Sequence, residues 1–97
     1  MPVAVLERQI ESKVKDYARS RGFLAYKFTS PGHAFVPDGL FISPKGVVFF
    51  IEFKRKGCVP TPGQFREHQR LIAHGVSVYV IDSADTGKSV IDTYANP

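Results

Sequence analysis

A predicted β-hairpin between residues 37 and 54 constrains this chain more than any other segment. Two apolar runs flank the three-residue loop 44–46, Pro-Lys-Gly, whose composition suits a type I turn closed by a left-handed glycine. A loop of this length fixes the register of both strands and places Asp38 directly opposite Glu52, with Cβ atoms about 5 Å apart. Like charges that face each other across two strands destabilise a sheet. A divalent cation between the two carboxylates is the expected compensation.

Lys54 lies on the same face as Glu52, because side chains alternate along a strand. Glu52 follows five apolar residues, where a buried carboxylate is costly unless it is paired or bound to metal. Two plainer interpretations stay open. Glu52 could form a salt bridge with Lys54 or Lys56, and Asp38, within Pro-Asp-Gly, could stabilise a turn. If the carboxylates instead hold Mg²⁺ or Mn²⁺, the pattern suits phosphodiester hydrolysis.

Hydrophobic periodicity predicts one α/β (α+β) domain with the element order α-β-β-β-α-β and a mixed sheet flanked by helices. The run 47–51 is apolar on both faces, which is typical of a central strand. The last strand is expected to lie parallel to its neighbour, because a helix precedes it. A further short element is expected at 89–94. The predicted helices span 4–21 and 62 to about 74, with Thr61 as the cap of the second, and the predicted strands span 23–28, 37–43, 47–54 and 76–81.

Composition narrows the class of protein. A chain of 97 residues has room for a single domain, residues 1–97. Its net charge of +4 favours an anionic partner, nucleic acid first, although a merely basic surface would give the same charge. Cys58 is the only cysteine, which excludes an internal disulfide and fits a reducing cytoplasm. No apolar run approaches the roughly 20 residues of a membrane span, so no membrane association is expected.

The three histidines do not suggest a zinc site. Only His68 and His74 are close in sequence, and a spacing of six places them on different faces of a helix. No Ser/His/Asp relay and no phosphate-binding glycine loop is evident either. The acidic hairpin is therefore the one candidate for catalysis.

The set Asp38, Glu52 and Lys54 resembles the PD-(D/E)xK nuclease signature. Together with its flanks, the chain more narrowly resembles the VRR-NUC branch of that superfamily, which is related to archaeal Holliday-junction resolvases. The resemblance implies a restriction-endonuclease-like fold. The chain departs from the family at Phe35, where a small residue is usual, and at Gly39, where a larger one is usual. The motifs that carry the resemblance are Ile10-Glu11, Gly22-Phe23, 27–32, 36–38, 48–54, 61–64 and 75–80.

The resemblance implies a metal-dependent active site within the hairpin. Asp38, Glu52 and the main-chain carbonyl of Phe53 would bind Mg²⁺ or Mn²⁺. Lys54 would position or deprotonate the attacking water. No small-molecule cofactor is implied.

Two helix residues would extend this site by the same resemblance. Glu11 would complete the acidic cluster, directly or through water. It is preferred to Glu7, one turn earlier, because it borders the buried stripe of the helix and its distance to Gly22 suits the family. Gln64 would reach the active site or the phosphate, and an exposed helix residue is the alternative.

The implied function is that of a metal-dependent DNA endonuclease acting on branched DNA such as a Holliday junction. A homodimer would supply two active sites, with apolar positions of the last strand and second helix at its interface. The lack of accessory domains is compatible with a phage or mobile-element origin, and a cytoplasmic location in a bacterial or phage-infected host cell is expected. The alternative is a non-catalytic nucleic-acid-binding module that retains the fold. The predicted DNA contacts are Lys27, Ser30, His33, Lys56 and Arg66.

Overall fold

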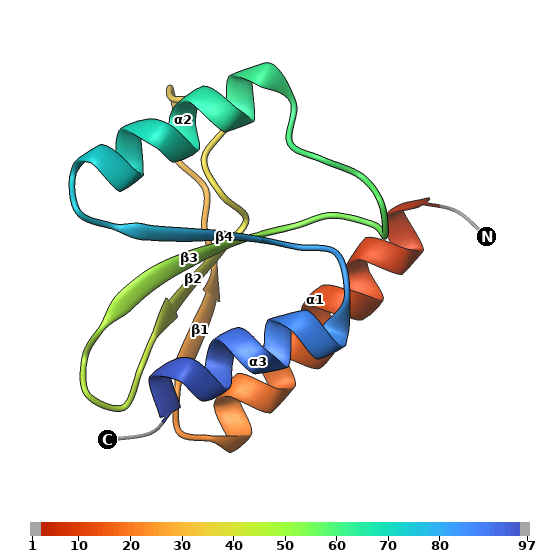
Figure 1. Cartoon of the computed structure of the whole chain (residues 1–97), viewed down its shortest axis with the longest axis vertical. Coiled ribbons are helices and arrows are strands. Elements are labelled where there is room, and N and C mark those ends of the chain that lie inside the picture. Colours follow the sequence, from red (N-terminus) through yellow and green to blue (C-terminus); the bar gives the residue numbers. More distant parts are fainter. Residues whose placement is uncertain (1–2, 96–97) are drawn as a thin grey trace.

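The computed structural model describes residues 3–95 and contains a four-stranded sheet with three helices. The strand order is β1-β2-β3-β4, with β4 parallel to β3 and the other neighbours antiparallel. Helices α1 and α3 cover one face of the sheet, and α2 covers the other (Figure 1). This is the predicted mixed sheet with one more helix. The elements are α1 (Val3–Ser20), β1 (Leu24–Lys27), β2 (Gly39–Ile42), β3 (Val48–Phe53), α2 (Pro62–Ala73), β4 (Ser77–Ile81) and α3 (Ala84–Ala95).

The hairpin of β2 and β3 has the predicted register. Gly46 closes the turn with a φ of 86°, and its N–H donates to the Ser43 carbonyl at 2.8 Å. The Ser43 N–H donates to Val47 at 2.9 Å. The ladder ends where Gly39 pairs with Ile51. The next residue of each strand is one of the two predicted carboxylates, and both therefore lie at the same end of the hairpin.

Strand β3 is the buried centre of the fold, as its apolar sequence predicts. All its residues except the first are buried. Phe49, Ile51 and Phe53 belong to the core that α1 and α3 cover. Because side chains alternate, Glu52 faces the opposite layer, under α2. The fold therefore buries one acidic side chain on an otherwise apolar strand.

Helix α3 is longer than the sequence predicts. The expected element at 89–94 is the second half of a helix that begins at Ala84. Its first turn reads as a loop because it is polar and contains Gly87. The structure gives that glycine a packing reason, since an added Cβ would lie 2.4 Å from Val14 of α1. Ser83, whose hydroxyl accepts from the Thr86 N–H at 3.2 Å, provides the helix cap.

The structure offers no candidate for a membrane span: between residues 3 and 95, no helix is both long enough and apolar enough to cross a bilayer.

Candidate active site

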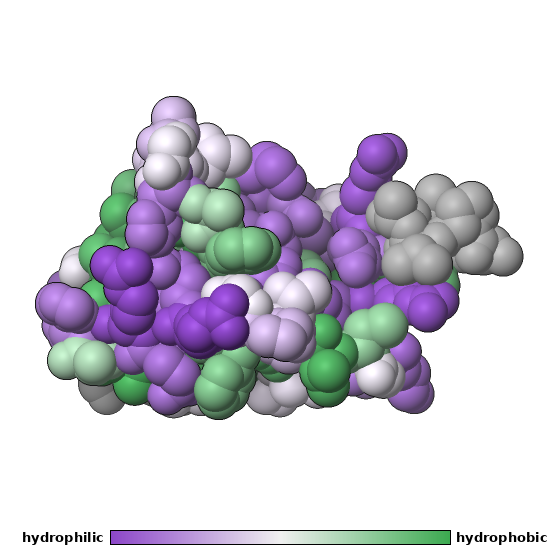
Figure 2. Space-filling view, turned by 90° about the horizontal axis from the view of Figure 1, so that it is seen from above, coloured by the Kyte–Doolittle hydropathy of each residue, from purple (hydrophilic) through white to green (hydrophobic). Residues whose placement is uncertain are grey.

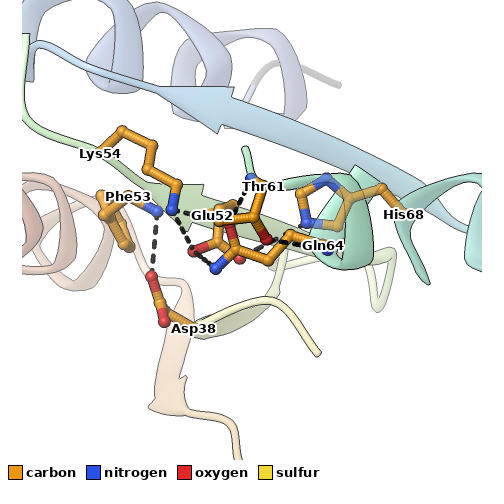
Figure 3. Close-up of polar contacts among 7 residues, drawn as sticks. All are labelled: Asp38, Glu52, Phe53, Lys54, Thr61, Gln64 and His68. Atoms are coloured by element: carbon orange, nitrogen blue, oxygen red, sulfur yellow. Dashed lines mark hydrogen bonds and ion pairs between the residues drawn. The ribbon is translucent and has the colours of Figure 1, made fainter. Parts of the chain in front are cut away.

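Asp38 and Glu52 meet at the end of the β2–β3 hairpin, below the start of α2 (Figure 3). Glu52 is only 2% exposed. Asp38 Oδ2 accepts a hydrogen bond from the Phe53 N–H at 3.2 Å, and the Asp38 carbonyl accepts from the Phe28 N–H at 2.6 Å. These bonds anchor Asp38 to both neighbouring strands. The pair that the register predicts is therefore assembled from rigid backbone.

Lys54 and Gln64 form the second part of this cluster. Lys54 Nζ donates to Gln64 Oε1 at 2.8 Å and lies 3.8 Å from Glu52 Oε2. Gln64 Nε2 lies 3.5 Å from the same carboxylate oxygen. The amide of Gln64 thus links the lysine to the glutamate, and the structure brings four of the five predicted catalytic side chains together, with Glu11 the exception (Figure 3).

The position of Gln64 follows from the way α2 begins. Thr61 is the N-cap and Pro62 follows it in the first turn. Thr61 Oγ1 accepts from the Gln64 N–H at 3.3 Å, and Gln64 Oε1 accepts from the Thr61 N–H at 3.0 Å. This is a reciprocal capping box. The same Gln64 oxygen therefore caps the helix and holds Lys54.

His68 is a member of the site that sequence reasoning missed. It lies one turn after Gln64 on α2, is 4% exposed, and places Nε2 3.4 Å from Glu52 Oε1. Burial, helped by the positive charge of Lys54, lowers the pKa of His68 below its ordinary value. A neutral imidazole protonated on Nε2 can donate to the carboxylate. The i, i+4 spacing from Gln64 was the available signal, because it places both side chains on one helix face.

With both carboxyl groups ionised, the site would hold more negative charge than Lys54 neutralises. Burial first, and then the charge and hydrogen bonding of Asp38, together raise the pKa of Glu52 to about 8, while Lys54 opposes the shift. Without a bound cation, Glu52 therefore retains a proton at neutral pH. Two adjacent carboxyl groups, of which Glu52 is buried and Asp38 half-buried, suit a hard divalent cation, which prefers oxygen ligands and would allow both to ionise.

Side chains alone do not complete a metal site in the described part of the chain. No group of three or more His, Cys, Asp or Glu residues between 3 and 95 is arranged to hold a metal ion. Mg²⁺, however, is commonly bound by one or two carboxylates together with water and substrate phosphate. Asp38 and Glu52 supply that number of carboxylates, and main-chain oxygen would have to add to them.

The structure gives the predicted acid on α1 a different partner. Glu11 accepts a hydrogen bond from Lys15 Nζ at 2.6 Å, as an i, i+4 ion pair along the helix. The α1 carboxylate that influences the site is Glu7, whose charge contributes to the raised pKa of Glu52. Glu11 was preferred from the sequence for its place beside the buried stripe and its distance to Gly22. Helix periodicity alone does not show which turn of α1 lies next to the hairpin.

The predicted DNA contacts are divided between several surfaces. His33 Nε2 pairs with Glu67 Oε1 of α2 at 2.8 Å, and Ser30 accepts the backbone N–H of His33 at 3.1 Å. Lys27 instead lines a hollow with Glu11 and Lys15 on the α1 side of the sheet. The remaining two, Lys56 and Arg66, are exposed.

Comparisons with known proteins extend beyond the hairpin. No family model matches the chain. In sequence it is 47% identical over 81 residues to "Putative nuclease p44" of Acyrthosiphon pisum secondary endosymbiont phage 1, a match covering 84% of this chain and 87% of that protein. In structure it is similar to a solved "VRR_NUC domain" with a TM-score of 0.84 and 32% identity, over 92% of this chain and 97% of that one. Each match covers more than four fifths of this chain, 84% in sequence and 92% in structure.

Proposed function

Because this chain belongs to the VRR-NUC family of nuclease domains, we propose that it is a metal-dependent DNA endonuclease acting on branched DNA. The observation that carries the proposal is the buried carboxyl group of Glu52. It lies beside Asp38 with a raised pKa and has Lys54 and Gln64 at one of its oxygens. A fold that needed only stability would gain by replacing such a group with an apolar one.

Asp38, Glu52 and the main-chain carbonyl of Phe53 would hold Mg²⁺ or Mn²⁺. When bound, such an ion lowers the pKa of water and neutralises charge on the phosphate. Lys54 would orient the attacking water, since Gln64 fixes its Nζ beside Glu52. The amide of Gln64 would also help to keep the lysine from forming a closed ion pair with the glutamate.

One carboxylate of α1 would complete the acidic cluster. Glu11 is the residue that the family resemblance suggests, but it is engaged by Lys15. Glu7 acts electrostatically on Glu52 and is therefore the stronger candidate. Comparing Glu7→Gln with Glu11→Gln in a cleavage assay decides between them, and the variant with the larger loss of kcat identifies the residue.

The DNA backbone would contact cations and polar groups on the α2 side of the sheet and, at Lys27, on the α1 side. Lys27, Ser30, His33, Lys56 and Arg66 are the proposed contacts, and the net charge of +4 supports an anionic partner. Such binding weakens steeply with salt, because each neutralised phosphate releases counterions.

Cutting both strands of a junction would require two active sites, which a twofold homodimer supplies. Strand β4 is an edge of the sheet. Its residue Val80 is 41% exposed, and Ile72 at the end of α2 is 45% exposed. A hollow of about 370 Å³ lies along this edge, lined by Ile72 and residues 75–79. These features support an interface formed by β4 and the end of α2. The phage origin of the 47% identical relative supports action in the cytoplasm of an infected bacterial cell.

A cleavage assay tests the proposed function. Wild type, Asp38→Asn and Glu52→Gln are incubated with a labelled four-way junction and with plasmid DNA, in Mg²⁺, Mn²⁺ or EDTA. We expect cutting only with a divalent metal, and a loss of at least about a hundredfold in either variant, because each removes a charged oxygen ligand. Asp16→Asn, which changes an exposed carboxylate of α1, is the control and should cut normally.

Two results would contradict this assignment. Wild type that cuts in EDTA as well as in Mg²⁺ would exclude metal dependence. Wild type that binds the junction and never cuts it, whatever the metal, would instead favour the non-catalytic binding module.

A further inference from the structure

Phe35 has a backbone conformation that is unusual for its type. Its φ is 72°, and among residues 3–95 it is the one non-glycine residue with positive φ. A bulky residue in this region is strained, and such strain persists only where surrounding contacts enforce it. The ring is nevertheless 52% exposed, so core burial does not account for the conformation.

Gly63 in the first turn of α2 provides the seat for this ring. A Cβ built on Gly63 would lie 2.8 Å from Phe35 Cε2 and Cζ and 2.9 Å from Cε1. Only a residue without a side chain allows the outer edge of the ring to rest there. Gly63 has no positive φ, so its value at this position is the close approach. It directly precedes Gln64, and Phe35 comes three residues before Asp38. The contact therefore joins the two elements that bear site residues.

A second contact holds the same loop. The Ser30 carbonyl accepts from the His33 N–H at 3.1 Å, with Gly32 at φ 80°, as in a type II turn. His33 Nε2 then pairs with Glu67 Oε1 at 2.8 Å, and this hydrogen bond lowers the pKa of Glu67. The loop is thus fastened to α2 at His33 and at Phe35. These two contacts hold the exposed ring of Phe35 in a fixed position.

The face that bears α2 presents apolar side chains among hydrophilic ones (Figure 2). A fixed, half-exposed aromatic ring beside a phosphate-cleaving site matches one ligand chemistry well, namely a nucleobase. Every base has a π-face, so base–aromatic stacking tolerates any sequence. Bases inside a duplex are already stacked on their neighbours. Only a base released from its pair is free to stack on Phe35.

We propose that Phe35 is a stacking platform for an unpaired nucleobase next to the scissile phosphate. The substrate class is then DNA with unpaired nucleotides, such as a branch point, flap or gap. This inference rests on the proposed nuclease function and adds to it the basis of its selectivity. Phe35 selects substrates by contact with the base and takes no part in bond cleavage.

The test measures binding with a fluorescent base analogue, 2-aminopurine, placed in a single-stranded gap of an otherwise duplex DNA. EDTA is present throughout, so the readout does not depend on cleavage. We expect wild type to quench the fluorescence, because stacking does so. Phe35→Leu, which keeps an apolar side chain without a π-face, should lose the quenching and bind gapped DNA roughly tenfold more weakly, with duplex binding changed less than twofold. Phe35→Tyr should restore both properties.

Phe65→Leu is the matched control, because Phe65 is also an exposed aromatic residue of this region, at 56%. It should behave as wild type. Gly63→Ala is the second variant and keeps Phe35, but its Cβ would displace the ring; it should show the same selective loss. If Phe35→Leu fails to fold, as judged by circular dichroism, Gly63→Ala decides the matter.

Equal losses on gapped and duplex DNA, or no loss with either variant, would overturn the inference. The failure of the proposed function looks different. Wild type that quenches 2-aminopurine in gapped DNA and cuts nothing in any metal would overturn the endonuclease and leave the stacking platform intact. Wild type that cuts, with a branched-to-duplex ratio unchanged in Phe35→Leu, would overturn the platform alone.

Discussion

The buried carboxyl group of Glu52 makes the stability of this protein depend on pH. Its pKa is about 8 in the folded protein, against 4.5 ordinarily. Between these values the folded chain binds one more proton than the unfolded chain, so the free energy of unfolding falls as pH rises from about 4.5 to about 8. Glu52→Gln removes this dependence. We expect it to exceed wild type in stability by roughly 2–4 kcal/mol at pH 8.5, with little difference at pH 4.5.

Urea unfolding at the two pH values, in EDTA, measures this difference. Asp16→Asn replaces a carboxylate whose side chain is 76% exposed and should follow wild type at both. If Glu52→Gln is less stable than wild type at pH 8.5, the folded wild-type protein accommodates the ionised Glu52 carboxylate well without metal.

Metal binding should offset the loss of stability that ionisation of Glu52 causes. A cation that binds the folded state at one hundred times its Kd adds about 2.7 kcal/mol, which for a chain of this length raises Tm by roughly 10 °C. We expect Mn²⁺ to produce such a shift in wild type at pH 8 and almost none in Glu52→Gln. The apparent affinity should weaken as pH falls below 8, because the ion must displace the Glu52 proton. Differential scanning fluorimetry across pH and Mn²⁺ concentration checks both points.

His68 is expected to position Glu52 through the contact of Nε2 with Oε1. His68→Phe keeps the volume of a ring and removes the donor, so we expect kcat or Mn²⁺ affinity to fall about 10- to 100-fold. His68→Gln, whose amide nitrogen can occupy a place near Nε2, should recover part of the loss. Equal activity of the Phe and Gln variants would show that His68 only fills space.

Residue identity in this site was predictable where the chain itself fixes the geometry. Asp38, Glu52 and Lys54 belong to one hairpin, so turn length and strand alternation determine how they meet. His68 could not be derived in this way, because its contact depends on where α2 lies over β3. The choice between Glu7 and Glu11 stays open for a similar reason, since both share a helix face and only the placement of α1 separates them.

At the scale of elements, the start of α2 combines helix capping with site assembly. Thr61→Ala removes the cap hydroxyl that accepts the Gln64 N–H and should cost about 1 kcal/mol of stability. It leaves the bond between Lys54 and Gln64, so kcat should change little. Gln64→Ala removes both the cap acceptor and the lysine partner, and it should lower stability and kcat together.

Thermal unfolding and cleavage rates, measured for both variants, separate the two roles. Gln64→Glu keeps a capping-box acceptor while adding a third carboxylate beside Glu52, and it should preserve stability better than activity. A Thr61→Ala variant that loses as much kcat as Gln64→Ala would indicate that the cap alone positions the site.

Elements whose ends have clear local sequence signals were predicted well, whereas an element that depends on tertiary packing was predicted only in part. The turn at Gly46, the cap at Thr61 and the glycine that ends α1 at Gly22 each have a local chemical cause, and each occurs as expected. The start of helix α3 cannot be predicted from local sequence, because its first turn is polar and contains Gly87. It is stabilised by packing on α1, including a hydrogen bond from Tyr17 to Asp92 at 2.6 Å, which no local pattern reveals.

At the scale of the whole molecule, the sheet has two free edges with different surroundings. Strand β1 is one edge and β4 the other. Hydrophobic alternation predicts which strands exist and that β4 joins β3 in parallel. It does not predict that a hollow of about 370 Å³ opens beside β4 and the end of α2. That feature arises from packing and gives the proposed dimer a specific location.

Ile72→Lys tests that location, because Ile72 lines the hollow and is 45% exposed. A lysine there would bring a positive charge from each protomer into the proposed interface and bury both on association. We expect the variant to be monomeric by light scattering at concentrations where wild type is dimeric. Its active site is intact, so it should still nick plasmid DNA. Four-way junctions should accumulate single nicks without paired cuts. Leu24→Lys changes a residue of β1 that is 51% exposed and should remain dimeric; a monomeric wild type would exclude this interface.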